Sequence, residues 1–305
     1  MARRVKIAAV GIRPPTAESR ILERGSMLDL VLHHVVRELE QAFAWRPDLV
    51  LLPESCDRPL DLPDSEAGRW DRENGPAVQD ALARIARERG CVIAYGRGTA
   101  SLIVIERDGT VAGRHDLLPG GPPPLVSCSL GNLACVLSDE MQSERLRQRY
   151  RRLGPDIIVL ASRFPGGVLE RAWAFDCRAH LASAVLFRSD LRLPCRIVSP
   201  VGAVVDTSTT SRSHARAVIN LDSAVIHLDN HREKLLALEG ADPDGIAVQD
   251  PGYLGGVLVS NEAAGGTIRD KLARAGIETI DQYFTRYLSE RDRSLARGTP
   301  RGGTA

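Results

Sequence analysis

Residues 131–162 read GNLACVLSDEMQSERLRQRYRRLGPDIIVLAS and contain two apolar runs on either side of a helical pattern. The apolar run within 131–140 predicts a buried strand, and 143–154 predicts a helix that ends at a glycine. A second apolar run at 156–162 predicts another strand. Two short apolar strands joined by an amphipathic helix are typical of the crossover unit of an α/β protein.

The same alternation of strands and helices extends in both directions from this unit. A hairpin at 101–118 turns at Asp108-Gly109, a dipeptide that favours tight β-turns. Because hairpins are mixed with helical crossovers, the order favours a layered α/β architecture with mixed sheets over an all-parallel Rossmann fold. The other predicted strands are 5–12, 48–54, 91–96, 184–189, 195–206 and 214–222, and the other predicted helices are 26–45, 76–90 and 170–183.

The composition of the chain changes after residue 240. Glycine and aspartate become frequent around 240–256, and two helical patterns follow, the second at 279–297. The last residues, 297–305, predict a frayed tail. We therefore expect a main domain over residues 1–240 and a C-terminal extension over 241–305, made of a connector, two helices and the tail.

The charge balance and the apolar runs exclude some classes of partner. The 305-residue chain has 40 basic and 39 acidic residues, a formal net charge of +1, which argues against nucleic-acid binding through bulk electrostatics. No apolar run approaches the roughly 20 residues that a membrane-spanning helix needs. The N-terminus reads as a first strand rather than a signal peptide, so we expect a cytoplasmic protein that binds neither membrane nor nucleic acid.

The six cysteines and seven histidines are scattered, without the paired spacing of a metal site. We expect reduced thiols, mostly buried as small hydrophobic residues, and neither a metal nor a cofactor. Only Lys6, Lys234 and Lys271 among the 40 basic residues are lysines, and the other 37 are arginines. A mechanism that needs a lysine in the middle of the chain therefore has none to use.

Polar residues stand at or near the ends of predicted strands. Glu54 ends DLVLLPE, Ser138 follows LACVL, and Arg114 lies in GRHDLLP. Function concentrates at such positions in α/β folds, because the sheet holds the side chains while the following loops leave them accessible. A carboxylate at a strand end is more often a solvated cap than a base, so the signal lies in the order and surroundings of all three residues.

Six segments in a fixed order carry a family resemblance: VKIAAVGIRPP at 5–15, RPDLVLLPES at 46–55, IERDGTVAGRHDLLP at 105–119, GNLACVLSDE with GPDIIVLAS within 131–162, RAWAFDCRAH at 171–180 and RIVSPVGAVV at 196–205. From residue 5 to about 235 the sequence resembles the nitrilase, or carbon–nitrogen hydrolase, superfamily. Gly11 departs from the pattern, because a glutamine is common there. The resemblance implies an α-β-β-α sandwich with mixed sheets, followed here by a C-terminal helical extension.

The resemblance also implies roles for individual residues. In that family a glutamate is the general base, a lysine stabilises the developing oxyanion and a cysteine is the nucleophile. Glu54 matches the glutamate, whereas Arg114 stands at the lysine position and Ser138 at the cysteine position. Glu140 matches the acidic residue two positions after the nucleophile, but the family's second glutamate has no counterpart after Pro119.

These substitutions weaken the expected chemistry. A serine hydroxyl is far harder to deprotonate than a thiol, whose pKa is about 8.5, and an arginine does not hold its donors where a lysine does. Cys135 could be the nucleophile only if the strand were shifted by three residues, which would swap its faces. His115 and His180 lie close to the matched motifs and stay open as supporting residues.

We therefore expect little or no nitrilase or amidase turnover, and a remnant cleft where Glu54, Arg114 and Ser138 bind a small polar ligand. The alternative is an active hydrolase or acyl transferase that acts on a small amide or related C–N bond with Ser138, or less favourably Cys135, as nucleophile. A third interpretation is a non-catalytic oligomeric scaffold. Under all three the resemblance implies a homodimer or higher homo-oligomer, because the family commonly dimerises through its nucleophile-side helices.

Overall fold

The computed structural model describes residues 2–16, 26–117, 125–187, 193–229, 231–252 and 255–296. The chain divides into two compact units, one formed by Arg4–Ile219 and the other by Met1–Arg3 together with Asn220–Ala305. The division falls after residue 219, whereas the sequence predicted a boundary at residue 240. The segment between these two positions belongs to the second unit.

Two six-stranded mixed sheets form the first unit. Their strands are β1 (Arg4–Val10), β2 (Leu49–Leu52), β3 (Val92–Arg97), β4 (Ser101–Ile105), β5 (Val111–Asp116) and β12 (His214–Asn220) in the first sheet, and β6 (Val126–Cys128), β7 (Gly131–Leu137), β8 (Ile157–Ser162), β9 (His180–Val185), β10 (Arg196–Val198) and β11 (Val204–Thr207) in the second. The first sheet has the order β12-β1-β2-β3-β4-β5, with β1, β2 and β3 parallel and the pairs β3–β4 and β4–β5 antiparallel. The second has the order β11-β10-β9-β8-β7-β6, with β7, β8 and β9 parallel.

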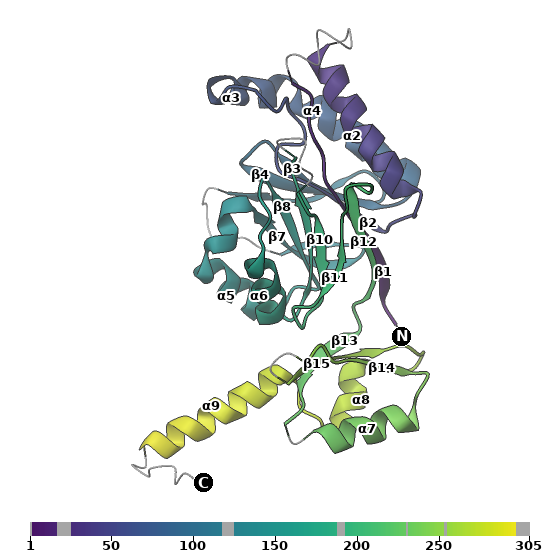
Figure 1. Ribbon diagram of the computed structural model, residues 1–305, viewed down its shortest axis with the longest axis vertical. Coiled ribbons are helices and arrows are strands. Elements are labelled where there is room, and N and C mark those ends of the chain that lie inside the picture. The colour runs from purple at the N-terminus through teal and green to yellow at the C-terminus, as the bar shows by residue number, and fades with distance from the viewer. Residues whose placement is uncertain are drawn as a thin grey trace. The chain divides into compact units, whose positions relative to one another are not determined.

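Helices cover the outer face of each sheet (Figure 1). Helices α2 (Met27–Phe43) and α4 (Gly75–Arg89) share one apolar core with the first sheet. Helices α5 (Glu144–Leu153) and α6 (Val168–Cys177) share another with the second sheet. The inner faces of the sheets meet, since β2 packs against β8 and β9. The first unit is therefore the α-β-β-α sandwich that the sequence predicted.

Local sequence signals set several of these element ends. Helix α2 begins after Ser26, whose Oγ accepts a hydrogen bond from the N–H of Asp29 at 3.1 Å. Helix α4 ends at Gly90, which has a left-handed φ of 63°. The predicted hairpin is confirmed as β4 and β5, and Gly109 has a φ of 84° in its turn.

Several elements of the first unit differ from the sequence prediction, which gave no strand at β6 and placed the strand now seen as β9 at 184–189. The helix predicted at 170–183 ends at Cys177, because Arg178 takes the left-handed region at a φ of 54°. Strand β9 then begins at His180, and all of its residues are buried. Helix α3 (Asp64–Glu73) was not predicted, because none of its residues is buried and an apolar stripe is therefore missing from its sequence.

Gly11 follows β1 and leaves room for an aromatic ring. A Cβ at Gly11 would lie 2.1 Å from Cζ of Phe187, which no real contact allows. The N–H of Phe187 donates to the carbonyl oxygen of Ile12 at 2.8 Å, beside a β-bridge between Ile12 and Leu186 that links the two sheets. A glutamine, which is common at this position in the resembled family, would not fit against the ring.

A three-stranded antiparallel sheet forms the second unit, with β15 (Gly256–Asn261) between β13 (Ser223–His227) and β14 (Ile246–Gln249). Helices α7 (Arg232–Ala241) and α8 (Ile268–Arg274) share its apolar core. The sequence predicted neither these strands in the extension nor α7. The second unit, which includes residues before the predicted boundary at 240, thus folds around its own core and is not a connector followed by helices.

Helix α9 (Ile280–Ala296) is the last described element of the chain. The two helices predicted for the extension are confirmed as α8 and α9. The tail predicted at 297–305 lies outside the described residues. Within the part of the chain that the structure describes, no helix combines the length and the apolar character needed to cross a membrane.

Candidate active site

Glu54 follows β2, at the carboxyl end of a buried parallel strand. Its backbone passes so close to β3 that a Cβ on Gly96 would lie 2.4 Å from the Cα of Glu54, so this approach requires glycine. Ser55 has a left-handed φ of 59°, and its N–H and Oγ donate to the carbonyl oxygen of Gly98 at 2.9 and 3.0 Å. These contacts hold Glu54 in one position.

Asp57 anchors the far end of the loop that begins at Glu54. Its Oδ1 accepts a hydrogen bond from the N–H of Gly98 at 2.9 Å, and the whole residue is buried. Burial raises the pKa of Asp57 to about 6, with a smaller rise from the charge of Asp71 and a lowering by the Gly98 hydrogen bond. The segment from Glu54 to Asp57 is therefore tied to the end of β3.

Ser138 stands at the carboxyl end of β7, in the second sheet, where it begins the short 3₁₀ helix η1 (Ser138–Gln142). Its hydroxyl donates to Oε2 of Glu54 at 2.5 Å, and its N–H donates to the same oxygen at 3.3 Å. Strand ends from two different sheets thus bring a hydroxyl and a carboxylate into direct contact. The structure brings together these two of the three residues that the sequence expected to converge.

Arg163 follows β8, the strand beside β7, and completes this cluster. Its backbone N–H donates to Oγ of Ser138 at 2.8 Å, and its Nε forms an ion pair with Oε1 of Glu54 at 2.9 Å. Oγ of Ser162 lies 3.2 Å from Oγ of Ser138, but its one proton is taken by the carbonyl oxygen of Phe164 at 2.6 Å. Ser138 therefore donates to Glu54 and accepts from Arg163.

Burial dominates the electrostatics of Glu54. Only 2% of its side chain is exposed, against 24% for Arg163. Burial raises the pKa of Glu54 above its usual 4.5, although the hydrogen bond from Ser138 and the charge of Arg163 each lower it. The guanidinium thus lies beside a carboxylate that is shielded from water, and the guanidinium is the more accessible of the two groups.

Arg114 lies elsewhere, and the expectation that it joins Glu54 and Ser138 is wrong. Its guanidinium donates to Oδ1 of Asp116 at 2.6 Å and to Oγ of Ser101 at 2.7 Å, and its side chain is half-exposed. Across the ladder between β4 and β5, Arg114 pairs with Ile103, which belongs to the core under α2 and α4. Because directly paired residues share a face of the sheet, Arg114 lies on the outer face.

A β-bulge in β5 explains this difference. The register between β4 and β5 shifts between Val104 and Ile105, and Ala112 is the extra residue on β5. A shift of one residue exchanges the two faces of a strand. The bulge leaves Arg114 on the outer face and His115 on the inner face, whereas the family resemblance had placed position 114 at the site.

His115 bridges the two sheets through Glu140. Its Nε2 lies 2.8 and 3.0 Å from the two carboxylate oxygens of Glu140 in η1, and the His115 side chain is buried. Oε2 of Glu140 also accepts the N–H of Leu137 at 2.9 Å, immediately before Ser138. His115, which the sequence left open as a supporting residue, is thus bonded to Glu140, the acidic residue two positions after Ser138, and the pair holds the end of β7.

Comparison with solved structures connects this arrangement to known proteins. Nit3 from Saccharomyces cerevisiae, a member of branch 10 of the nitrilase superfamily, superposes with a TM-score of 0.59 at 15% identity, over 79% of this chain and 94% of Nit3. A carbon–nitrogen hydrolase from Helicobacter pylori G27 gives 0.58 at 14% identity, over 72% and 90%. The C. elegans NitFhit protein gives 0.57 at 15% identity, over 89% and 97%. No family sequence model and no curated protein sequence matches the chain.

The chain has the nitrilase-superfamily fold. In this nitrilase fold the cluster of Glu54, Ser138 and Arg163 lies where strands of both sheets end. Among the described residues, no group of three or more histidine, cysteine, aspartate or glutamate side chains could hold a metal ion. All six cysteines are free thiols, five of them buried and Cys128 partly buried.

Cys135 lies within β7 of the nitrilase fold and is fully buried. Burial raises the pKa of its thiol well above the usual value, and the hydroxyl of Tyr150 donates to its backbone carbonyl oxygen at 2.8 Å. A buried thiol without access to substrate is inert, so the structure does not present Cys135 as a nucleophile. His180 is likewise buried, and burial lowers its pKa to about 4.

Sequence reasoning missed Arg163 and Ser162. Both stand at the end of β8, which is parallel to β7 and adjacent to it in the sheet. The rule that selected Glu54 and Ser138, a polar residue at the end of a buried strand, applies equally to them. The motifs of the resembled family assign no role to position 163, so they gave no signal for Arg163.

Proposed function

We propose that this chain has little or no nitrilase or amidase turnover and that it binds a small polar ligand at Glu54, Ser138 and Arg163. The observation that carries the proposal is the ion pair between Arg163 and Glu54 at 2.9 Å. A cation that neutralises the base opposes proton transfer to it, and the same cation is not free to stabilise a developing oxyanion. The chain therefore lacks a general base and a separate oxyanion-stabilising cation of the kind that the resembled family uses.

The nucleophile position supports the same proposal. The hydroxyl of Ser138 donates to Glu54, but a carboxylate is a far weaker base than an alkoxide, so full proton transfer lies strongly uphill. In a glutamate-to-glutamine mutant of the amidase from Nesterenkonia sp. AN1, a structural neighbour, acrylamide has added to the active-site cysteine. A thiol forms its nucleophilic anion much more readily than a serine hydroxyl does.

The accessible polar groups favour a ligand with a carbonyl or carboxylate oxygen. Glu54 is shielded, whereas the Arg163 guanidinium is 24% exposed and offers paired N–H donors to such an oxygen. The carboxylate of Asp139 is 69% exposed, lies 3.8 Å from the same guanidinium and could accept an amide N–H. We therefore propose small amides, or the corresponding acids, as the class of ligand.

Titration calorimetry with propionamide and with propionate tests this proposal, with NMR analysis of the ligand after incubation. We expect at least one of the two to bind with one ligand per chain and to be recovered unchanged. Arg163→Gln should weaken binding by about tenfold or more, because a charge-assisted pair of hydrogen bonds is lost. Arg152→Gln, at an exposed position of α5, is the matched control and should bind as the wild type does.

Two outcomes would contradict the proposal. One is the absence of binding by both probes, and the other is binding that Arg163→Gln leaves unchanged. A thermal melt of each variant checks that the fold is kept, so that a loss of binding can be assigned to the guanidinium.

A second candidate function is hydrolysis or acyl transfer with Ser138 as the nucleophile. It is favoured by the 2.5 Å contact between Ser138 and Glu54, which is within reach for proton transfer, and by the raised pKa of Glu54. Conversion of propionamide that both Ser138→Ala and Glu54→Gln abolish would favour this second function over the first.

A further inference from the structure

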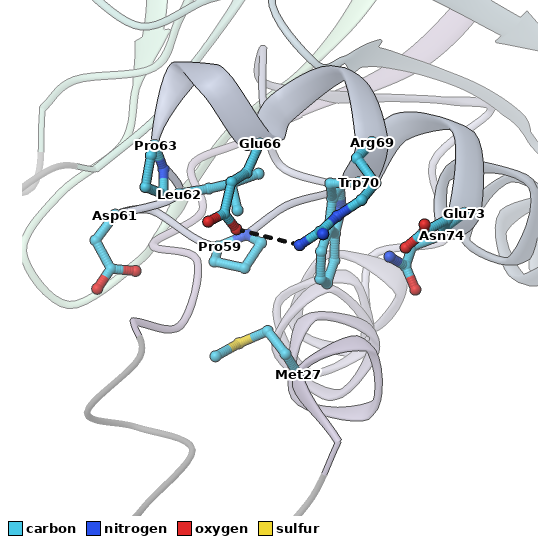
Figure 2. A pocket seen from close by; sticks show the side chains of 10 residues that line it. All are labelled: Met27, Pro59, Asp61, Leu62, Pro63, Glu66, Arg69, Trp70, Glu73 and Asn74. Atoms are coloured by element: carbon cyan, nitrogen blue, oxygen red, sulfur yellow. Dashed lines mark ion pairs between the residues drawn. The ribbon is translucent and has the colours of Figure 1, made fainter.

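A cavity in the first unit lies between the start of α2 and helix α3 (Figure 2). Its volume is about 350 Å³, within the range of small-molecule sites. Its apolar walls include Pro59, Leu62 and the indole of Trp70. The residues that line it are distinct from the cluster around Glu54, so the proposed function does not explain the cavity.

The indole of Trp70 is a fixed wall of this cavity. Its Nε1–H donates to the backbone carbonyl oxygen of Asp57 at 3.0 Å, and Asp57 is itself held by the N–H of Gly98. The ring is therefore oriented by its edge, while the side chain borders the cavity (Figure 2). An aromatic face held in this way attracts a cation through the ring quadrupole.

Acidic side chains also line the cavity. Glu66 and Glu73 line the cavity from α3, with Asp61 on the preceding loop, whereas Arg69 is the one cation among the lining residues. Figure 2 shows the guanidinium of Arg69 reaching toward Glu66, and the two groups pair at 3.6 Å. Their side chains are 64% and 51% exposed, and pairs of this kind are weak. A guanidinium of the protein thus already lies beside the carboxylate, in a pair that is easily exchanged.

We propose that this cavity binds a small organic cation, an ammonium or guanidinium group carried on a flat apolar body. The apolar body packs against Trp70 and Pro59, and the cation lies between the indole and the carboxylates of Glu66 and Glu73. Arg69 competes with the ligand for Glu66. This inference does not rest on the proposed function, because the two sites share no residue.

Benzylammonium is the probe for this cavity, with benzyl alcohol as its neutral counterpart of the same shape and phenylacetate as an anion. The indole N–H signal of Trp70 in NMR spectra, assigned with Trp70→Phe, reports binding at this place. We expect benzylammonium to bind about three- to tenfold more tightly than benzyl alcohol, and phenylacetate to bind more weakly than both. Equal affinity for the cation and the alcohol, or a Trp70 signal that does not respond, would overturn the proposal.

Variants of the charged residues test the assigned contacts. Glu66→Gln and Glu73→Gln should each weaken benzylammonium binding by about two- to fivefold, and Glu88→Gln on an exposed position of α4 should leave it unchanged. Arg69→Ala should strengthen binding by about the same factor, because it removes the internal competitor. Weaker binding by Arg69→Ala would contradict the proposal, since a merely supporting arginine predicts that result.

Discussion

The carboxylate of Glu54 contacts Arg163 through one oxygen and Ser138 through the other. A glutamate that activates a nucleophile needs a pKa near the working pH and an oxygen aimed at the departing proton. Burial raises the pKa of Glu54 and Oε2 meets the hydroxyl of Ser138, so both conditions are approached. The ion pair between Arg163 and Oε1 of Glu54 lowers the pKa of Glu54, because it favours the charged carboxylate. The Arg163 guanidinium, being paired, is also less able to stabilise charge on a substrate.

Replacing Ser138 by cysteine alone should not produce a competent amidase. The variant gains a better nucleophile, but Arg163 still pairs with Glu54, and one missing oxyanion donor typically costs about 10²–10³ in rate. Adding Arg114→Lys should not increase the rate further, because position 114 lies on the outer face of the first sheet, away from Glu54 and Ser138. Ammonia release from propionamide, measured for the single and double variants, checks this. A double variant well above the single one would show that position 114 reaches the site.

Asp57 predicts a pH dependence of stability. Its folded-state pKa of about 6 lies above the usual 3.8, so between these values the folded protein holds a proton that the unfolded chain has lost. The contribution of Asp57 therefore falls as the pH rises from about 4 to about 6 and is constant above that. Asp57→Asn keeps an oxygen for the N–H of Gly98 and should be more stable than the wild type by about 1–3 kcal/mol at pH 7.

Urea unfolding of both proteins between pH 4 and pH 8 measures this difference. The advantage of Asp57→Asn should be small at pH 4 and should grow until about pH 6. A difference that is independent of pH, or a variant that is less stable at pH 7, would contradict the assignment of the buried carboxylate.

At the scale of elements, the pattern of apolar residues predicted most strands and helices of the two sheets, because each buries one face or both. It gave no strand at β6, and it placed at 184–189 the strand that the structure has at His180–Val185. The turn at Gly109 was also predictable, since its residues favour a tight turn. The bulge at Ala112 was not, because one extra residue in a strand leaves its local composition unchanged while exchanging its faces. This bulge also affects the site prediction. The positions of Glu54 and Ser138 could be predicted from the sequence, whereas the face of the sheet on which Arg114 lies could not.

The junction between β1 and β9 makes a prediction about packing. Gly11→Ala should destabilise the protein by about 1–3 kcal/mol, because the added methyl group would overlap the ring of Phe187. Thermal or urea unfolding measures the loss. Combining Gly11→Ala with Phe187→Leu should cost less than the sum of the two single changes, because the smaller side chain makes room for the methyl group. Additive losses would show that the ring yields without strain.

At the scale of the whole molecule, the chain divides after Ile219, a boundary that the pattern of apolar residues did not predict. Strands β13, β14 and β15 are short and pair with one another across intervening helices and loops. Neighbouring residues do not reveal which short apolar runs pair, so the sequence predicted a connector over the residues of β14 and no strand at β15. The second unit buries Leu235, Ile268 and Leu272 in a core of its own, which the sequence pattern did not indicate.

Self-association remains a proposal, and the surface of the first unit supports it. Val168 is 76% exposed at the start of α6, and Phe164 and Leu153 are also exposed near α5 and α6. Exposed apolar side chains such as Phe164 and Val168, four residues apart, favour burial between subunits. We expect a homodimer or higher homo-oligomer in sedimentation-velocity experiments, and we expect Val168→Glu to shift it toward the monomer. A wild type that stays monomeric at all concentrations would contradict this expectation.

Ammonia release by the wild type from a panel of short amides and nitriles tests whether the chain lacks nitrilase and amidase turnover. The claim is that the pairing of Arg163 with Glu54, together with a serine at position 138, leaves the nitrilase fold without turnover. We expect rates equal to those of Ser138→Ala across the whole panel. Wild-type turnover well above that of Ser138→Ala, and lost again in Glu54→Gln, would contradict the account and establish Ser138 as a nucleophile.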